Sequence, residues 1–190
     1  MSDSTNKYQN KILTIPNILS FFRLCLIPVL IWLYISKKDY LSTLLVLLLS
    51  GLTDIVDGIV ARKYNMISNF GKIFDPVADK LTQMAMLFCL VSRFNYMLIP
   101  LVILVIKELI SGITSLISFK SANEVKGAVW HGKLTTVTLY SVIAIHLIWF
   151  NISKTISLIL VGISIGIMLM SFIMYSVQNF KAIKNKSFDD

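Results

Sequence analysis

The chain has 190 residues, of which 56% are hydrophobic, and its mean hydropathy is +0.76. These values exclude an ordinary soluble or disordered chain and predict one all-α integral membrane domain. The formal net charge of +8 would suit nucleic acid, but no Lys/Arg stripe with interleaved aromatic residues lies outside the hydrophobic runs. We therefore expect no nucleic-acid partner and assign the charge to contacts with anionic membrane lipid and anionic substrate.

Residues 1–15 are polar and then mildly amphipathic, and they lack the hydrophobic core and cleavage site of a signal peptide. We expect them to be kept as a short cytosolic or juxtamembrane segment. After them, six hydrophobic runs approach the roughly 20 residues that a helix needs to cross a bilayer. They predict six transmembrane helices in a domain of residues 16–180, at residues 18–35, 40–61, 72–91, 96–119, 131–150 and 155–177.

Three polar residues lie at the start of the first run: Asn17, Ser20 and Arg23. Their spacing places them on or near one face of a helix, where polar groups are hard to explain as lipid-facing. Anchoring at the membrane interface and contact with a ligand are both open explanations on these residues alone.

Four aspartates lie at the end of the second run and the start of the third: Asp54, Asp57, Asp75 and Asp79. Residues three or four apart are neighbours on a helix, so each run carries an acidic pair on one face. A carboxylate in hydrocarbon costs roughly 2.5–3.5 kcal/mol on insertion scales, so this group requires compensating cations. Oxygen ligands without His or Cys favour Mg²⁺, Mn²⁺ or Ca²⁺, and Mg²⁺ commonly joins carboxylates to phosphate. The aspartates therefore predict a metal site for a phosphate-bearing substrate.

Small and polar residues lie between the two acidic pairs. Gly58 and Ala61 leave the helix surface beside the carboxylates open to a ligand. Arg62 offers a planar fork of donors to a phosphate, and Ser68 in the following connection can also reach one. These residues are consistent with the phosphate-binding interpretation of the aspartates.

Gly71 is expected to break the pattern between the two acidic helices, and Pro76 predicts that the third helix begins near Phe74 or Asp75. Together the fixed residues form one spaced pattern, Asp54-x2-Asp57-Gly58-x2-Ala61-Arg62-x8-Gly71-x3-Asp75-x3-Asp79. All eight positions resemble the signature of the CDP-alcohol phosphatidyltransferase family. The six hydrophobic runs extend this resemblance over nearly the whole chain.

The resemblance implies a substrate, a cofactor and roles for the residues of the pattern. The substrate would be CDP-diacylglycerol, and the cofactor would be Mg²⁺ or Mn²⁺, as two ions held by the four aspartates. Asp79 would also be the catalytic base that takes the proton of the attacking hydroxyl. By the same resemblance, five residues would contact the CDP-lipid: Asn17, Ser20, Gly58, Arg62 and Ser68.

Two lysines farther along the chain are candidates for binding the acceptor. Lys107 lies next to Glu108 inside the fourth run, where a packing or salt-bridge role and a phosphate-binding role are both open. Lys133 lies near the start of the fifth run, at the same membrane face as the carboxylates if the helices alternate. The resemblance implies that both lysines hold the acceptor.

The acceptor itself is predicted from two short segments. Enzymes of the phosphatidylglycerophosphate synthase type often carry Ala-Arg-Glu in the fourth helix and Gly-Lys-x-Lys-Thr at the fifth. The corresponding segments here are residues 106–108, Ile-Lys-Glu, and residues 132–136, Gly-Lys-Leu-Thr-Thr, in which the second lysine is absent. Glycerol 3-phosphate is the preferred acceptor, and a cardiolipin synthase reaction with phosphatidylglycerol is the alternative.

Topology follows from the distribution of basic residues. Six crossings place both termini on one side, with residues 181–190 as a basic tail, and only four of the 18 Lys and Arg residues fall on the other: Lys37, Lys38, Arg93 and Lys154. The positive-inside rule makes the richer side cytoplasmic. The termini and the site are therefore predicted to face the cytosol from a multi-pass protein of the cell membrane.

Two further possibilities concern partners and a rival function. Gly162 and Gly166 form a Gly-x3-Gly pair in the sixth run, which predicts close helix packing or a homodimer contact. Acidic residues in a membrane domain are also compatible with a divalent-cation transporter. A transport pathway would distribute its acidic residues through the depth of the membrane, whereas these gather at one face.

Overall fold

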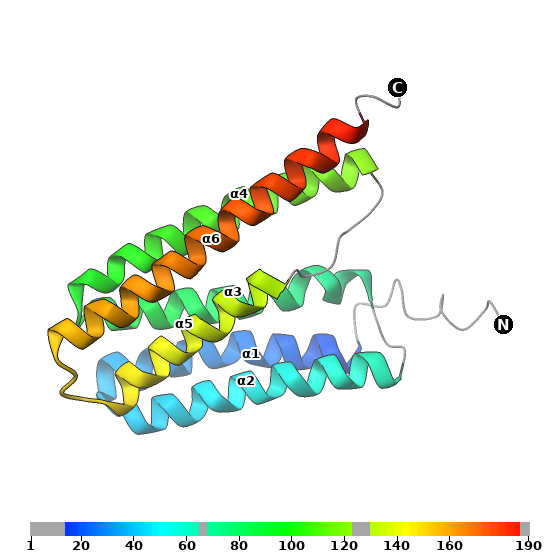
Figure 1. Cartoon of the computed structure of the whole chain (residues 1–190). Helices are drawn as coiled ribbons and strands as arrows, with labels where there is room; N and C mark the ends of the chain where they lie inside the picture. The colour runs from blue at the N-terminus through cyan, green and yellow to red at the C-terminus, as the bar shows by residue number, and fades with distance from the viewer. Residues whose placement is uncertain (1–13, 65–67, 123–129, 187–190) are drawn as a thin grey trace. The chain divides into compact units, whose positions relative to one another are not determined.

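The computed structural model describes residues 14–64, 68–122 and 130–186, and over these ranges it contains six α-helices and no strand. Figure 1 shows the helices in chain order: α1 (Ile15–Ile31), α2 (Tyr40–Lys63), α3 (Asn69–Val91), α4 (Leu98–Ala122), α5 (Trp130–Ile148) and α6 (Lys154–Lys186). The chain divides into two compact units, Met1–Ser92 with α1–α3 and Arg93–Asp190 with α4–α6. The all-helical class predicted from the sequence is confirmed.

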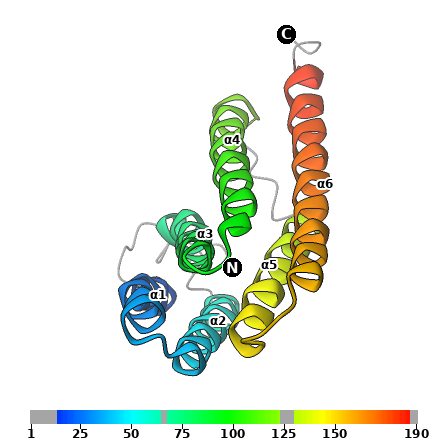
Figure 2. The ribbon, with the colours of Figure 1, turned by 90° about the vertical axis from the view of Figure 1, so that its left-hand side faces the viewer.

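Helix α1 is the central helix of the first unit, because it packs against both α2 and α3. Figure 2, which looks along these three helices, shows α1 beside each of the other two. Its buried face is polar near the start, at Asn17, Ser20 and Arg23, and apolar farther along, at Leu30. The polar part of the α1 face therefore lies in the interior of the first unit and does not face lipid.

Short capping contacts set the ends of the first two helices. The Thr14 hydroxyl accepts a hydrogen bond from the Asn17 backbone N–H and caps α1, while Asp39 caps α2 by accepting from the Ser42 N–H at 3.0 Å. Between them, a π-helical turn, Trp32–Lys37, extends α1, and Lys38 adopts a left-handed conformation with φ of 53°. A polar side chain at each N-cap satisfies backbone donors that a helix start otherwise leaves without a partner.

Helix α3 begins earlier than Pro76 suggested. Its N-cap is Ser68, whose hydroxyl accepts from the Gly71 N–H at 2.9 Å, and Pro76 lies inside the helix. The predicted start near residues 74 and 75 is therefore wrong, because a capping hydroxyl earlier in the chain outweighs the one backbone bond that a proline removes. Gly71 likewise lies in the first turn of α3 and does not separate two helices.

In the second unit the central helix is α6, which packs against both α4 and α5. A short 3₁₀ turn, Asn95–Met97, leads into α4. The buried positions of α6 follow a spacing of alternately four and three residues: Ser157, Val161, Ser164, Met168 and Ser171. This is the seam of a helix that packs along its length, and small serines at every seventh position allow close approach of the neighbouring helices.

Four helical segments in the described ranges are long and apolar enough to cross a membrane: Ile15–Lys37, Tyr40–Ala61, Asn95–Ile113 and Lys154–Val177. The apolar part of α5, Gly132–Ile148, is shorter. These segments support a multi-pass integral membrane protein. The count of six crossings stays a prediction.

Candidate functional site

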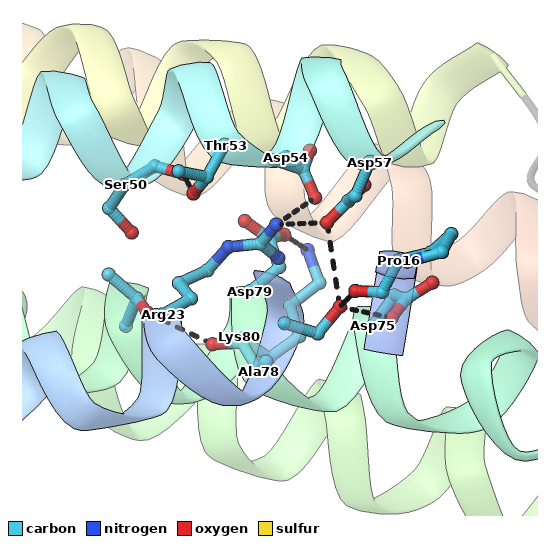
Figure 3. A network of polar contacts seen from close by, with 12 residues as sticks. Pro16, Arg23, Ser50, Thr53, Asp54, Asp57, Asp75, Ala78, Asp79 and Lys80 are labelled. Atoms are coloured by element: carbon cyan, nitrogen blue, oxygen red, sulfur yellow. Dashed lines mark hydrogen bonds and ion pairs between the residues drawn. The ribbon is translucent and has the colours of Figure 1, made fainter. Parts of the chain in front are cut away.

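Arg23 of α1 links the two aspartates of α2. Its Nη2 atom lies 2.9 Å from Asp54 Oδ1 and 2.8 Å from Asp57 Oδ2, so one nitrogen is shared by two carboxylates. Figure 3 shows the guanidinium group pointing from α1 toward these side chains. The Arg23 and Asp57 side chains are buried, whereas 48% of the Asp54 side chain is exposed. The pair compensates a buried charge that would otherwise be costly.

Ser20 connects the aspartates of α2 to those of α3. Its hydroxyl lies 3.4 Å from Asp57 Oδ2 and is also hydrogen-bonded to Asp75 Oδ1 and, at 3.1 Å, to the Pro16 carbonyl oxygen. A hydroxyl has one proton to donate, so only one of these three oxygens receives it at a time. Ser20 therefore brings a carboxylate from each helix to the same point on α1.

Asp79 lies one turn farther along α3 and has contacts of its own. Its Oδ2 atom accepts a hydrogen bond from Gln83 Nε2 at 3.2 Å and lies 3.7 Å from Lys80 Nζ. Both partners belong to α3, so they orient this carboxylate from its own helix. Asp79 is partly buried, which leaves it reachable by a substrate group.

Asn17 and Ser68 join the starts of α1 and α3. Asn17 Nδ2 lies 3.0 Å from Ser68 Oγ, and Ser68 Oγ is 3.2 Å from Asn17 Oδ1, with both residues buried. A Cβ atom on Gly71 would lie 2.4 Å from Asn17 Oδ1 and 3.1 Å from Ser68 Oγ. Both residues are therefore used in a close contact between helices, and their predicted contact with the CDP-lipid stays a prediction.

The remaining predicted lipid contacts are described only in part. Gly58 is partly buried in α2, next to Asp57 in sequence. Arg62 lies in α2, but its side chain is outside the described residues. Their roles stay predictions.

The predicted acceptor residues lie in the second unit. Lys107 of α4 is buried, and its Nζ atom lies 2.8 Å from Glu108 Oε1 and 5.9 Å from the centre of the Tyr175 ring of α6. A Cβ atom on Gly132 of α5 would lie 2.9 Å from the Tyr175 hydroxyl. Three helices therefore converge at Tyr175. Lys133 follows Gly132 and is exposed.

The side chains of the first unit fit a divalent ion by their chemistry. All the acceptor atoms around Ser20 and Arg23 are oxygens, which suits Mg²⁺ or Mn²⁺. The shared nitrogen of Arg23 also shows that one cationic group can lie against Asp54 and Asp57 together. In the conformation seen, no three His, Cys, Asp or Glu residues of the described ranges are placed to enclose an ion. Ser20 and Arg23 thus link three of the four predicted ligands: Asp54, Asp57 and Asp75. Asp79 has contacts of its own, and the set is not closed around one point in the described structure.

Sequence reasoning placed Arg23 on the polar face of the first helix, with membrane anchoring and ligand contact both open, but did not connect it to the aspartates. The signal was a charge in an apolar run, three residues after Ser20 and six after Asn17. Several buried atoms of the first unit have no hydrogen-bond partner in the described part of the chain: Nε and Nη1 of Arg23, Oγ of Ser50 and Oε1 of Gln83. Buried polar atoms without partners are rare, so these atoms indicate that the interior of the first unit has donors and acceptors available to a ligand.

These features define an all-helical membrane protein with a carboxylate-rich site in its first three helices. A family model described as CDP-alcohol phosphatidyltransferase matches residues 13–180. The chain belongs to the CDP-alcohol phosphatidyltransferase family.

The curated relatives of this chain carry two different names. The chain is 31% identical over 179 residues to the CDP-diacylglycerol–glycerol-3-phosphate 3-phosphatidyltransferase of Aquifex aeolicus, covering 90% of this chain and 98% of that protein. It is 38% identical over 102 residues to the protein of the same name from Rickettsia typhi, covering 52% of this chain and 57% of that protein. A cardiolipin synthase (CMP-forming) of Streptomyces coelicolor is 43% identical over 83 residues, covering 40% of this chain and 38% of that protein. The matched segment thus spans little more than half of the Rickettsia relative.

Proposed function

We propose that this protein transfers a phosphatidyl group from CDP-diacylglycerol to glycerol 3-phosphate and releases CMP. The observation that carries the proposal is the meeting of Asp57 from α2 and Asp75 from α3 at Ser20, in a chain of the CDP-alcohol phosphatidyltransferase family. The acceptor is taken from the Aquifex relative, whose name specifies glycerol 3-phosphate and whose match covers most of both chains.

The four aspartates would hold two ions of Mg²⁺ or Mn²⁺: Asp54, Asp57, Asp75 and Asp79. When bound, such ions neutralise charge on a diphosphate and on the departing nucleotide. The oxygen-only donor set supports this proposal. Arg23 and Ser20 would hold the carboxylates of two helices in a fixed relation to the diphosphate.

Asp79 would accept the proton of the attacking hydroxyl. The acceptor oxygen forms a bond to the phosphorus that carries the diacylglycerol, the bond from that phosphorus to the bridging oxygen breaks, and CMP leaves with the electron pair. Gln83 and Lys80 contact the Asp79 carboxylate from its own helix, which orients it for this transfer.

Lys107 and Lys133 would bind the phosphate of the acceptor, with the Tyr175 ring beside Lys107. A cardiolipin synthase reaction, with phosphatidylglycerol as acceptor, is the second candidate, and the Streptomyces match supports it over a smaller part of the chain. Membership of a transferase family removes the support for a divalent-cation transporter.

The proposed topology has six membrane crossings, with both termini and the site on the cytoplasmic side. The four membrane-length segments and the distribution of Lys and Arg support this arrangement. A homodimer is proposed through Gly162 and Gly166 of α6, which are exposed within the described ranges, with no heavy atom within 4 Å of a Cβ built at either position.

The acceptor is tested with the full chain in detergent micelles that contain CDP-diacylglycerol and Mn²⁺. CMP release is measured with glycerol 3-phosphate, with phosphatidylglycerol and without acceptor. We expect fast release only with glycerol 3-phosphate. Release that depends on phosphatidylglycerol would favour the cardiolipin synthase reaction, and no release with any acceptor would contradict the proposal.

A further inference from the structure

We propose that Arg23 and Lys80 are built-in counter-cations that make tight binding of divalent ions depend on the diphosphate of the substrate. This inference rests on the function proposed above and concerns the same site. It assigns a role to two residues outside the eight-position pattern, and that role is to set the charge of the carboxylate group.

Arg23 occupies the oxygens that an ion would need. Its Nη2 atom lies within 2.9 Å of one oxygen of Asp54 and one oxygen of Asp57, and the Arg23 side chain is only 1% exposed. Asp57 is buried as well, so solvent screens its contact with Arg23 weakly, whereas the Asp54 side chain is 48% exposed and its contact is screened more strongly. A divalent ion that approaches these two oxygens therefore meets a positive charge already in place.

Lys80 forms a longer ion pair with Asp79. Its Nζ atom lies 3.7 Å from Asp79 Oδ2, and the two side chains are 19% and 17% exposed. Each helix that carries an acidic pair therefore has one cation against its carboxylates, Arg23 against α2 and Lys80 within α3.

The net charge of the carboxylate group determines whether two divalent ions can bind without a diphosphate. The four aspartates contribute four negative charges, and Arg23 and Lys80 offset two of them, which leaves two. Two divalent ions alone would make the group positive by two charges, and a diphosphate diester carries two negative charges. The complete set of protein, two ions and diphosphate is therefore neutral, whereas the protein with two ions is not. Binding of both ions is favoured when the diphosphate is present.

Arg23 also has donors left for the substrate. Its Nε and Nη1 atoms are buried and have no hydrogen-bond partner within the described ranges. A guanidinium group can therefore keep its contact with the aspartates through Nη2 and donate to a phosphate oxygen through its other nitrogens. Arg23 would then contact the aspartates and the diphosphate at the same time.

The test measures Mn²⁺ binding to the full chain in detergent, without nucleotide, from the rise in unfolding temperature as Mn²⁺ is added. We expect Arg23→Gln and Lys80→Gln each to lower the half-saturating Mn²⁺ concentration by roughly tenfold, because each removes one neighbouring positive charge. Arg23→Lys keeps the charge and is expected to remain within about threefold of the unsubstituted protein. Arg93→Gln is the matched control, because Arg93 donates to the Phe150 carbonyl oxygen in the second unit.

Equal or weaker Mn²⁺ binding in both Gln variants would overturn the inference. If Arg23→Gln does not fold, Lys80→Gln decides the question, because Lys80 is less deeply buried. Mn²⁺ binding detected only in the Gln variants would support the inference, since the counter-cations would then suppress binding in the unsubstituted protein. Failure of the proposed function gives a different result, which is absence of CMP release by the unsubstituted protein with every acceptor.

Discussion

The two units of this protein use buried polar groups in different ways. In α1–α3 the central helix carries Arg23 against two aspartates, and several buried polar atoms have no hydrogen-bond partner within the described ranges. In α4–α6 the central helix carries serines, and Ser157 is hydrogen-bonded to His146 Nε2 at 2.6 Å and accepts from the Tyr96 hydroxyl at 2.7 Å. The first arrangement retains charge and donors for a ligand, whereas the second satisfies neutral groups and fixes helix packing.

Two exceptions to this contrast are informative. Lys107 and Glu108 form an ion pair in the second unit, where Lys107 is proposed to bind the acceptor. Asn17 and Ser68 form a neutral contact in the first unit, where it fixes the start of α3 against α1. The ion pairs of Arg23 and Lys107 thus involve residues with a proposed ligand role, whereas the neutral Asn17–Ser68 contact joins two helices.

The largest effect is expected from Asp57→Asn. This substitution removes a carboxylate that contacts both Arg23 and Ser20, and we expect the rate of CMP release to fall by at least about 100-fold. The measurement is CMP release at saturating Mn²⁺, with the unfolding temperature as the control for folding. A folded variant with an unchanged rate would contradict the catalytic role of the first unit.

A smaller effect, on stability, is expected from Gly71→Ala. The new Cβ atom would overlap Asn17 Oδ1, so the Asn17 side chain must shift and its contact with Ser68 is disturbed, at a cost of about 1–3 kcal/mol. Gly51→Ala in α2 is the matched control, because no heavy atom lies within 4 Å of its Cβ in the described structure. Denaturant unfolding in detergent compares the two. Equal stability of both variants would mean that the contact between α1 and α3 is looser than described.

Lys133→Ala tests whether the second unit binds the acceptor. We expect the KM for glycerol 3-phosphate to rise about tenfold, because one charged contact to a phosphate is lost, while the KM for CDP-diacylglycerol changes little. Steady-state kinetics with each substrate varied in turn provide the measurement. An equal rise in both KM values would show that Lys133 does not distinguish the acceptor from the nucleotide-lipid.

The smallest effect is expected from Tyr96→Phe. It removes one hydrogen bond to Ser157 but leaves the bond between Ser157 and His146, so the free energy of unfolding should fall by about 0.5–1.5 kcal/mol. The half-saturating Mn²⁺ concentration should not change. A shift in Mn²⁺ dependence would break the contrast between a ligand-binding first unit and a packing network in the second.

The sequence predicts the helical class and the acidic pairs well, because hydrophobic run length and helical spacing are local properties. It does not predict that Arg23 is shared by Asp54 and Asp57, since that contact joins α1 to α2 and depends on how the helices pack. The start of α3 was misplaced for a related reason. Pro76 is a strong local signal, but the Ser68 hydroxyl, which also contacts Asn17 of α1, caps the helix earlier.

Lys107 illustrates a different limit. Its neighbour Glu108 is adjacent in sequence, and adjacent residues on a helix do not face each other, so the sequence left an ion pair and a ligand contact equally open. The long side chains nevertheless bring Nζ and Oε1 to 2.8 Å, and the Tyr175 ring lies near the same lysine. Side-chain reach and tertiary packing decide this contact, and neither is visible in the residue pattern.

The central claim is that divalent ions join the carboxylates of α1–α3 to the diphosphate of a nucleotide-lipid. The most direct measurement is CMP release from CDP-diacylglycerol and glycerol 3-phosphate after chelation of divalent ions, followed by stepwise return of Mn²⁺ or Mg²⁺. Our account predicts no release after chelation and full recovery on return of the metal. Undiminished release from the chelated protein would contradict it.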